Sequence, residues 1–322
     1  MLNKINLELY KSLYLIRKTE TEIRNYYYED DMKTPMHMSM GEEAIVAGVC
    51  LALGQNSQVF GTYRSHGLYL AKTGETDKFF AEMYGKETGG AKGKAGSMHL
   101  SAPEQGMMGT SAIVAGIIPV AVGASFANKK KKNNKITAVF FGDGAIDEGG
   151  FWESLNIACL MRLPVLFVCQ DNGFAVHTAG SLRHGYKSIT DIVSKFNCNV
   201  FKEETTDAES IYNLTQKAIK LIKKTKMPCF LFTRYYRYLE HVGINEDFDA
   251  GYRSKKEFEK WRKKDPIDLQ RKKLLKLGIK EGEIKKVETA IDNQIKKSIE
   301  LAKRAPFTKA SETYKDVFYE KK

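Results

Sequence analysis

Short apolar runs alternate with amphipathic stretches through the middle of the chain. The runs at 136–141, 164–169 and 229–233 are rich in β-branched and aromatic residues, which is typical of buried strands. Helical periodicity follows the first run at 149–161 and precedes the third at 211–225. Continuous apolar strands separated by helices predict an α/β fold, in which a parallel sheet carries helices on both faces.

The chain before this regular unit carries helical signals too. Positions 6–28 have their apolar residues near one face, and 41–53 has acids in its first turn and Gly54 after its end. A short strand is expected to begin at 57 and to run into a polar loop. The segment 109–129 is interpreted as a loop that leads into a buried helix of small residues.

From about residue 254 the sequence changes to strongly charged helices. One of them has an apolar stripe at helical spacing, which suits packing on a core. The stripe consists of Ile284, Val287, Ile291, Ile295, Ile299 and Ala302. We therefore expect an α/β domain at 1–253 and a helical extension at 254–322 that packs on the same domain.

The composition narrows the class of protein. The 322 residues have a formal net charge of +12, and the lysines gather at 128–135 and in the C-terminal region, where they are mixed with Glu. No aromatic residue interleaves with the lysine run to stack on bases, so nucleic-acid binding is not expected. No apolar run reaches the roughly 20 residues of a membrane helix. The N-terminal stretch lacks the apolar region of a signal peptide, and five scattered cysteines without a CxxC pair indicate reduced thiols in the cytoplasm.

Two glycine-flanked polar clusters stand at the ends of consecutive predicted strands. Asp143 lies in Gly-Asp-Gly after the first strand, and Asn172 lies in Asp-Asn-Gly after the second. Ligands of open parallel sheets bind beyond the carboxyl ends of the strands, so both side chains are expected in one crevice. Carboxylate and amide oxygens suit Mg²⁺, and glycines let backbone N–H groups approach a diphosphate. The alternative is a pair of ordinary strand-to-helix turns with a capping Asp.

The spacing of the two clusters resembles the thiamine diphosphate-binding signature. Between Gly144 and Asp171 lie 26 residues, and the pair that follows is Asp-Asn where the family usually has Asn-Asn. The resemblance implies that thiamine diphosphate is held through Mg²⁺. In that case Asp143 and Asn172 bind the metal, Phe174 offers it a backbone carbonyl, and Gly144 and Ala145 contact the diphosphate.

Further motifs occur in the order of a particular branch of that family. They lie at 36–53, 63–74, 88–100, 112–129 and 233–243. With the diphosphate unit they resemble the alpha subunit of the thiamine-dependent component of 2-oxo acid and acetoin dehydrogenase complexes. By that resemblance Tyr63, Arg64 and Arg237 contact the phosphates, and the backbone of Ile113 and Val114 meets the aminopyrimidine.

Three histidines match positions that line the active-site channel of the family. They are His37, His66 and His241. Histidine can move protons near neutral pH, which the reaction requires. The alternative for a histidine in a loop is a surface or loop-structuring role.

The cofactor also needs a glutamate that bonds to its aminopyrimidine. After the strand at 229–233 too few residues remain for a second α/β domain that could supply this group. The resemblance implies that a beta subunit provides it, in a heterotetramer of two alpha and two beta subunits. Glu42 and Glu43 are alternatives within the chain, although acids in the first turn of a helix usually interact with its dipole.

Three functions remain open from the sequence. The first is an oxidoreductase subunit that decarboxylates a 2-oxo acid or cleaves acetoin and passes the acyl group to the lipoyl domain of an acyltransferase. The second is a carboligase or transketolase-like enzyme that uses an aldehyde or a sugar, and the third is a basic binding module without activity. The loops at 239–242 and 245–254 depart from the pyruvate-type pattern, so the substrate is not defined.

Overall fold

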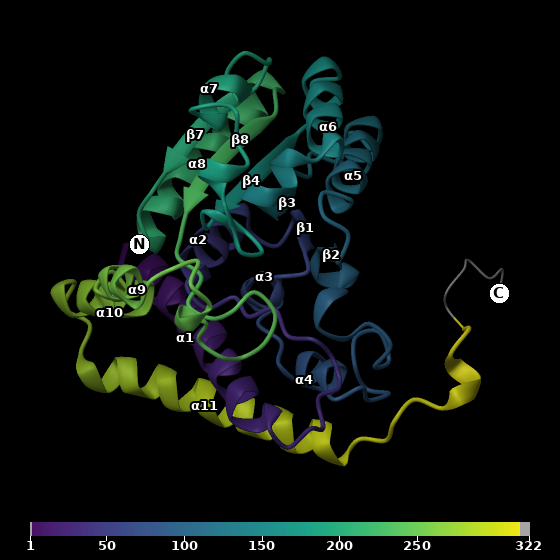
Figure 1. Cartoon of the computed structure of the whole chain (residues 1–322), viewed down its shortest axis with the longest axis vertical. Coiled ribbons are helices and arrows are strands. Elements are labelled where there is room, and N and C mark those ends of the chain that lie inside the picture. Colours follow the sequence, from purple (N-terminus) through teal and green to yellow (C-terminus); the bar gives the residue numbers. More distant parts are fainter. Residues whose placement is uncertain (1, 316–322) are drawn as a thin grey trace.

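The computed structural model of the chain describes residues 2–315. Its centre is a six-stranded sheet in the order β2-β1-β3-β4-β8-β7, in which every neighbouring pair is parallel (Figure 1). The strands are β1 (Gln58–Thr62), β2 (Met107–Ser111), β3 (Thr137–Gly142), β4 (Val165–Asp171), β7 (Asn199–Glu203) and β8 (Cys229–Arg234). A short antiparallel pair, β5 (Phe174–Ala175) and β6 (Thr178–Ala179), follows β4.

Helices cover both faces of this sheet. They are α1 (Leu2–Tyr27), α2 (Glu43–Leu53), α3 (His66–Thr73), α4 (Asp77–Met83), α5 (Ile117–Lys131), α6 (Gly149–Leu160), α7 (Ile189–Val193), α8 (Ala208–Thr225), α9 (Lys255–Arg262), α10 (Pro266–Lys276) and α11 (Glu281–Arg304). Side chains alternate between the faces because a strand has a period of two. Phe141 packs with Phe151 of α6, and Phe140 belongs to the core formed with α1, α2 and α8. The sequence-based prediction of an α/β fold is thereby confirmed.

The strands predicted at 136–141, 164–169 and 229–233 correspond to β3, β4 and β8. The pattern did not predict β2, which lies where a loop was expected, or β7. Both are edge strands of the sheet, and several of their residues are only half-buried. An edge strand therefore lacks the continuous apolar run that identifies the central strands.

The C-terminal helices lie against the N-terminal ones. Figure 1 shows α11 crossing one end of the molecule beside α1. Five of the six predicted stripe residues are buried there, namely Ile284, Ile291, Ile295, Ile299 and Ala302. Gln294 Nε2 donates hydrogen bonds to the carbonyl of Gly74 (2.9 Å) and to Thr76 Oγ1 (3.0 Å). The last residues of the predicted extension, 316–322, lie outside the described residues.

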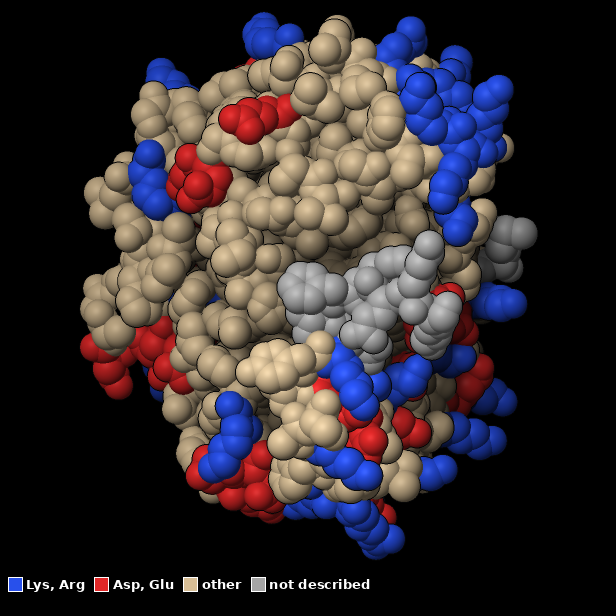
Figure 2. Space-filling model, turned by 90° about the vertical axis from the view of Figure 1, so that its right-hand side faces the viewer, with Lys and Arg blue, Asp and Glu red and all other residues tan. Residues whose placement is uncertain are grey.

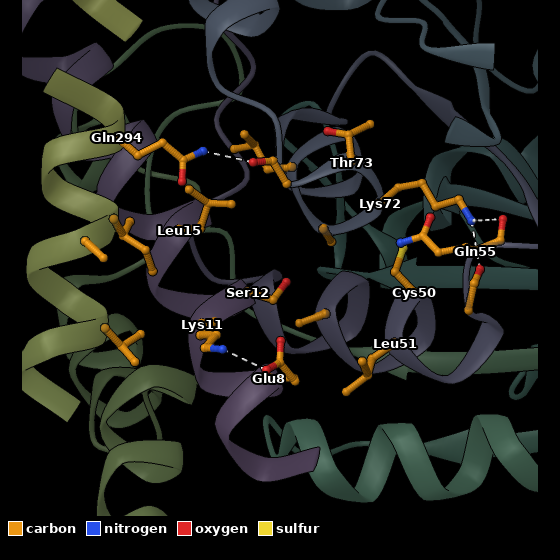
Figure 3. Close-up of a pocket in the computed structure, with 18 of the residues that line it drawn as sticks. Glu8, Lys11, Ser12, Leu15, Cys50, Leu51, Gln55, Lys72, Thr73 and Gln294 are labelled. Carbon is orange, nitrogen blue, oxygen red and sulfur yellow. Dashed lines mark hydrogen bonds and ion pairs between the residues drawn. The ribbon is translucent and has the colours of Figure 1, made fainter. Parts of the chain in front are cut away.

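A mostly apolar cavity of about 670 Å³ remains between α1, α2, α3 and α11. Figure 3 shows Ser12 and Leu15 of α1 between α11 on one side and α2 on the other. Lys72 is buried beside this cavity, and its ammonium donates to Ser57 Oγ (2.9 Å) and to the carbonyl of Gly54 (2.9 Å). Burial lowers the pKa of Lys72. Among the described helices none is long and apolar enough to cross a membrane.

Candidate active site

The carboxyl ends of β1, β3, β4 and β8 meet at one edge of the sheet. Register pairs Gly142 with Gln170, so the residues that follow β3 and β4 are neighbours. A cavity of about 270 Å³ opens at this edge. The lining includes these predicted site residues: Tyr63, Arg64, Val114, Asp143, Gly144, Ala145, Asn172, Phe174 and His241. Nine residues singled out from separate motifs therefore lie around one space, as expected at the carboxyl ends of parallel strands.

Asp143 begins the short helical turn after β3 and is almost fully buried. Its Oδ1 has no hydrogen-bond partner among the described residues, and its Oδ2 forms an ion pair with Arg183. Burial, with a smaller contribution from the Asp171 carboxylate, raises the pKa of Asp143 to about 6. A buried carboxylate oxygen without a partner costs free energy unless a cation or donor satisfies it.

Asn172 is fixed by the loop that leaves β4. Its Oδ1 accepts a hydrogen bond from the backbone N–H of Phe174 (3.1 Å), and its Nδ2 donates to the hydroxyl of Tyr235 (3.2 Å). Gly173 between them has a φ of 84°, which a side chain would rarely adopt. The carboxamide is thus held at the cavity by the strand that ends at Arg234 as well as by its own loop.

These groups fit a hard cation that is shared with a phosphate. In the part of the chain that the structure describes, no group of three His, Cys, Asp or Glu side chains could hold a metal ion. The oxygens at hand are one unpartnered carboxylate oxygen, one carboxamide and a backbone carbonyl, a set that suits Mg²⁺ when phosphate completes it. A Cβ on Gly144 would lie 3.0 Å from the Cβ of Ala175, so a side chain there would crowd the loop that lines this space.

The hairpin beside Asn172 is strained. Val176 joins β5 to β6 with a φ of 56°, in the left-handed region that β-branched residues avoid. Its carbonyl accepts a hydrogen bond from Arg237 Nη1 (3.3 Å). Arg237 is buried but is not part of the cavity lining; burial, followed by the charge of Arg64, lowers its pKa. Arg237 therefore contacts the loop and not the cavity directly.

Arg64, Tyr63 and His241 form the opposite wall, and the ring of His37 packs against the last two without lining the cavity. The rings of His37 and Tyr63 are 4.6 Å apart, and that of His241 lies 5.4 Å from His37. Arg64 Nη1 donates to the carbonyl of Met38 (2.6 Å), and Nη2 donates to the carbonyl of His241 (3.0 Å). Burial, with the charge of Arg64 second, lowers the pKa of both histidines to about 3. Both imidazoles are therefore neutral at physiological pH.

His66 lies apart from this wall. It is fully buried, with Nδ1 3.1 Å from Glu20 Oε1 and Nε2 2.6 Å from Ser97 Oγ, and it does not line the cavity. The same Glu20 oxygen accepts a hydrogen bond from the backbone N–H of Ser39 (2.6 Å). His66 is thus connected to the segment that carries His37, two residues before Ser39.

Ile113 and Val114 stand at the rim. Their side chains are 70% and 43% exposed, and Val114 contributes to the cavity lining. Ala115, which follows, has a φ of 58°. Two exposed apolar side chains therefore form the rim of the cavity.

Sequence reasoning gave little weight to Glu42 and did not single out Tyr235 and Arg183. Glu42 lines the cavity, is 1% exposed and has one oxygen without a partner in the described part of the chain. Burial raises the pKa of Glu42 to about 8, although the charge of Arg64 opposes this. An acid at the start of a helical pattern gives no signal of this kind, because its surroundings include Tyr235, which follows β8 and is far away in the sequence.

Comparison with known proteins defines the class to which this arrangement belongs. Residues 11–311 match the family described as the dehydrogenase E1 component. The alpha subunit of acetoin:2,6-dichlorophenolindophenol oxidoreductase from Bacillus subtilis is 31% identical over 98% of the chain and 94% of that protein. The pyruvate dehydrogenase E1 alpha subunits of Rhizobium meliloti and Rickettsia bellii are 30% and 28% identical, over 97% of the chain and 89% and 95% of those proteins. The chain therefore belongs to the dehydrogenase E1 component family, which confirms the resemblance found in the sequence.

Proposed function

We propose that the chain is the alpha subunit of a thiamine diphosphate-dependent dehydrogenase that decarboxylates a 2-oxo acid or cleaves acetoin. Family membership supports the reaction class, and similarity to pyruvate and acetoin enzymes supports these substrates over an aldehyde or sugar. The observation that carries the proposal is the unpartnered Asp143 oxygen beside Asn172 at two adjacent strand ends.

The cofactor-binding roles follow from the chemistry of the lining. Asp143, Asn172 and the carbonyl of Phe174 would hold Mg²⁺, and Gly144, Ala145, Tyr63 and Arg64 would hold the diphosphate. Arg237 would act through the Val176 loop, and the backbone at Ile113 and Val114 would meet the aminopyrimidine. When bound, thiamine diphosphate supplies a nucleophilic carbon and an electron sink for cleaving the bond next to a carbonyl group.

The histidines have distinct proposed roles. His37 and His241 are neutral at pH 7, so a ring nitrogen of His241, which lines the cavity, can donate a hydrogen bond to a substrate oxygen. His66 does not line the cavity, and its bonds to Glu20 and Ser97 suit a residue that positions the segment of His37. We infer that His241, which lines the cavity, contacts substrate, and that His37, whose ring lies 5.4 Å from that of His241, holds it in place.

We further propose a beta subunit as partner, in a heterotetramer of two alpha and two beta subunits. Figure 2 looks onto the side where α5 and α6 lie in Figure 1, and the upper half of this face has few charged side chains away from one corner. Exposed apolar residues on these helices and at the rim support a covered surface, among them Ile113, Val114, Val120, Ile157 and Leu160. The partner would supply the activating glutamate, and a lipoyl acyltransferase would accept the acyl group in the cytoplasm. Residues 1–253 would form the cofactor domain and 254–322 its helical extension.

The test is a reconstitution with the co-expressed beta subunit. Thiamine- and Mg²⁺-dependent release of CO₂ from one of a panel of 2-oxo acids, or of acetaldehyde from acetoin, is expected with an artificial electron acceptor. A complex that instead joins an aldehyde to a donor, and that reduces no acceptor, would indicate the carboligase alternative. A complex that binds no cofactor would leave only the binding-module alternative.

A further inference from the structure

A basic cleft of about 560 Å³ lies at the opposite edge of the sheet. Helices α5, α6 and α8 lead into the neighbouring strands β3, β4 and β8, so their C-terminal ends gather where these strands begin. The floor of the cleft is apolar and consists of Ile136, Pro164 and Ile222. Six cations surround this floor: Lys129, Lys132, Lys135, Arg162, Lys223 and Lys226.

The charge of the cleft is not neutralised by the protein. The lining includes no Asp or Glu, and none of the six cations forms an ion pair within residues 2–315. Figure 2 shows Lys and Arg gathered at an upper corner without Asp or Glu among them, at the height where α5 ends in Figure 1. Clustered cations in a hollow focus a positive potential that attracts an anion.

Three of these cations occupy backbone positions that favour glycine. Lys132, Arg162 and Lys226 follow α5, α6 and α8 with φ values of 52°, 52° and 59°. Glycine is the usual residue at such a left-handed helix end because it has no Cβ to clash. With Asn134, half of the eight non-glycine residues with positive φ in the described chain line this one cleft. Each of these three cations adopts a backbone conformation that costs free energy for a residue with a side chain. All three line the same cleft, which points to a function for their positive charge there.

The helix dipole does not account for these cations. The last turns of α5 and α8 already contain Lys130, Lys131 and Lys224, which can offset the negative helix ends without a left-handed residue. Those three lysines do not line the cleft. Lys130, Lys131 and Lys224 are therefore suitable control positions, because they carry the same charge near the same helix ends but lie outside the basic cleft.

Hydrogen bonds hold the three helix ends together. Lys129 Nζ donates to the carbonyl of Met161 (2.6 Å), which connects the end of α5 to that of α6. Arg162 Nη2 donates to the carbonyl of Thr225 (3.1 Å), which connects α6 to the end of α8. The cleft is therefore preformed, and its volume falls in the range of about 300–1,000 Å³ that accommodates small organic ligands.

We propose that the basic cleft binds a small organic molecule carrying a chain of phosphates, of the nucleoside triphosphate class. The cations match the phosphates, and the apolar floor matches the organic part. The absence of any aromatic residue from the lining argues against single-stranded nucleic acid, which needs rings for base stacking. The proposal is independent of the reaction at the other edge of the sheet.

The experiment is calorimetric titration of the full chain with ATP and with inorganic tripolyphosphate at physiological ionic strength. ATP is expected to bind more tightly than tripolyphosphate, because the apolar floor contacts its organic part. The triple variant Lys132→Gly, Arg162→Gly, Lys226→Gly should weaken binding at least about tenfold, since three of six cations are lost. Its melting temperature should change little, because the glycines suit the left-handed positions and offset the lost hydrogen bond from Arg162 to Thr225. The control Lys130→Gln, Lys131→Gln, Lys224→Gln removes the same charge and should keep the affinity within about twofold.

Four outcomes would overturn the proposal. One is no ATP binding at millimolar concentration, and a second is an equal loss of affinity in both triple variants, which would indicate attraction to net charge alone. A third is tighter binding of poly-glutamate than of ATP through the same three residues, which would indicate an acidic protein partner. The fourth is loss of ATP binding when thiamine diphosphate and Mg²⁺ saturate the chain, which would place ATP in the candidate active site.

Discussion

At the scale of single residues, Glu42 shows how burial changes the chemistry of a carboxyl group. Its folded pKa of about 8 lies above the ordinary value of 4.5, so the folded state favours the protonated form. The resulting stability is fully present below about pH 4.5 and is lost as the pH rises through about 8. Glu42→Gln should therefore match the wild type at low pH and exceed its free energy of unfolding at pH 8.5 by on the order of a few kcal/mol. Denaturant titrations at several pH values measure this, and parallel curves for both proteins would contradict it.

Asp143 is the residue whose negative charge the proposed metal site requires. Asp143→Asn keeps the shape and a partner for Arg183 but removes the buried negative charge that a metal ion needs. In the complex with the beta subunit, thiamine diphosphate and Mg²⁺ should raise the stability of the wild type by about 3 kcal/mol at 100 times the dissociation constant. The variant should melt at the same temperature with or without both ligands, and should be inactive. A normal ligand-induced shift in the variant would exclude Asp143 from the metal site.

At the scale of elements, the β5–β6 hairpin has a backbone strain that lowers the stability of the chain and that we expect to help position the cofactor-binding residues. Val176 holds a left-handed conformation that costs an L-residue about 1–2 kcal/mol, and a glycine would adopt it freely. Val176→Gly should raise the stability of the chain, although the added freedom of the unfolded state will reduce the gain to about 1 kcal/mol. The Michaelis constant for the cofactor should rise, because a looser hairpin positions Asn172 and Phe174 less well. Thermal unfolding and cofactor titration test the two parts separately.

The elements also show what the sequence could and could not predict. The apolar runs of β3, β4 and β8 are central strands, and their pattern alone placed Asp143 and Asn172 at one sheet edge. Half-exposed β2 and β7 have no such run, so they were missed. The ion pair of Asp143 with Arg183, 40 residues later, depends on the path of a loop and has no local signature. The burial of His66 likewise depends on α1 and on the loop of Ser97, which periodicity cannot bring together.

At the scale of the whole molecule, the exposed side of α5 fits the proposed interface with a beta subunit. Its exposed side includes Val120 and Gly123, and a Cβ on Gly123 would meet nothing within 4 Å in this chain. Glycine within a helix is less stable than most residues by up to about 1 kcal/mol, so the isolated chain derives no benefit from it. In the proposed complex, glycine at this position would let a partner helix approach closely.

Gly123→Gln should therefore have opposite effects on the chain and on the complex. The isolated chain should gain a few tenths of a kcal/mol or more in stability from the better helix former. Association with the beta subunit should weaken at least about tenfold, because the longer side chain would hold the partner away, and a lost contact of about 1.4 kcal/mol has this effect. Gly282→Gln, at an equally open glycine near the start of α11, is the matched control and should leave association unchanged. Sedimentation of mixed subunits measures both variants, and unaltered assembly of Gly123→Gln would place the partner on another face of the molecule.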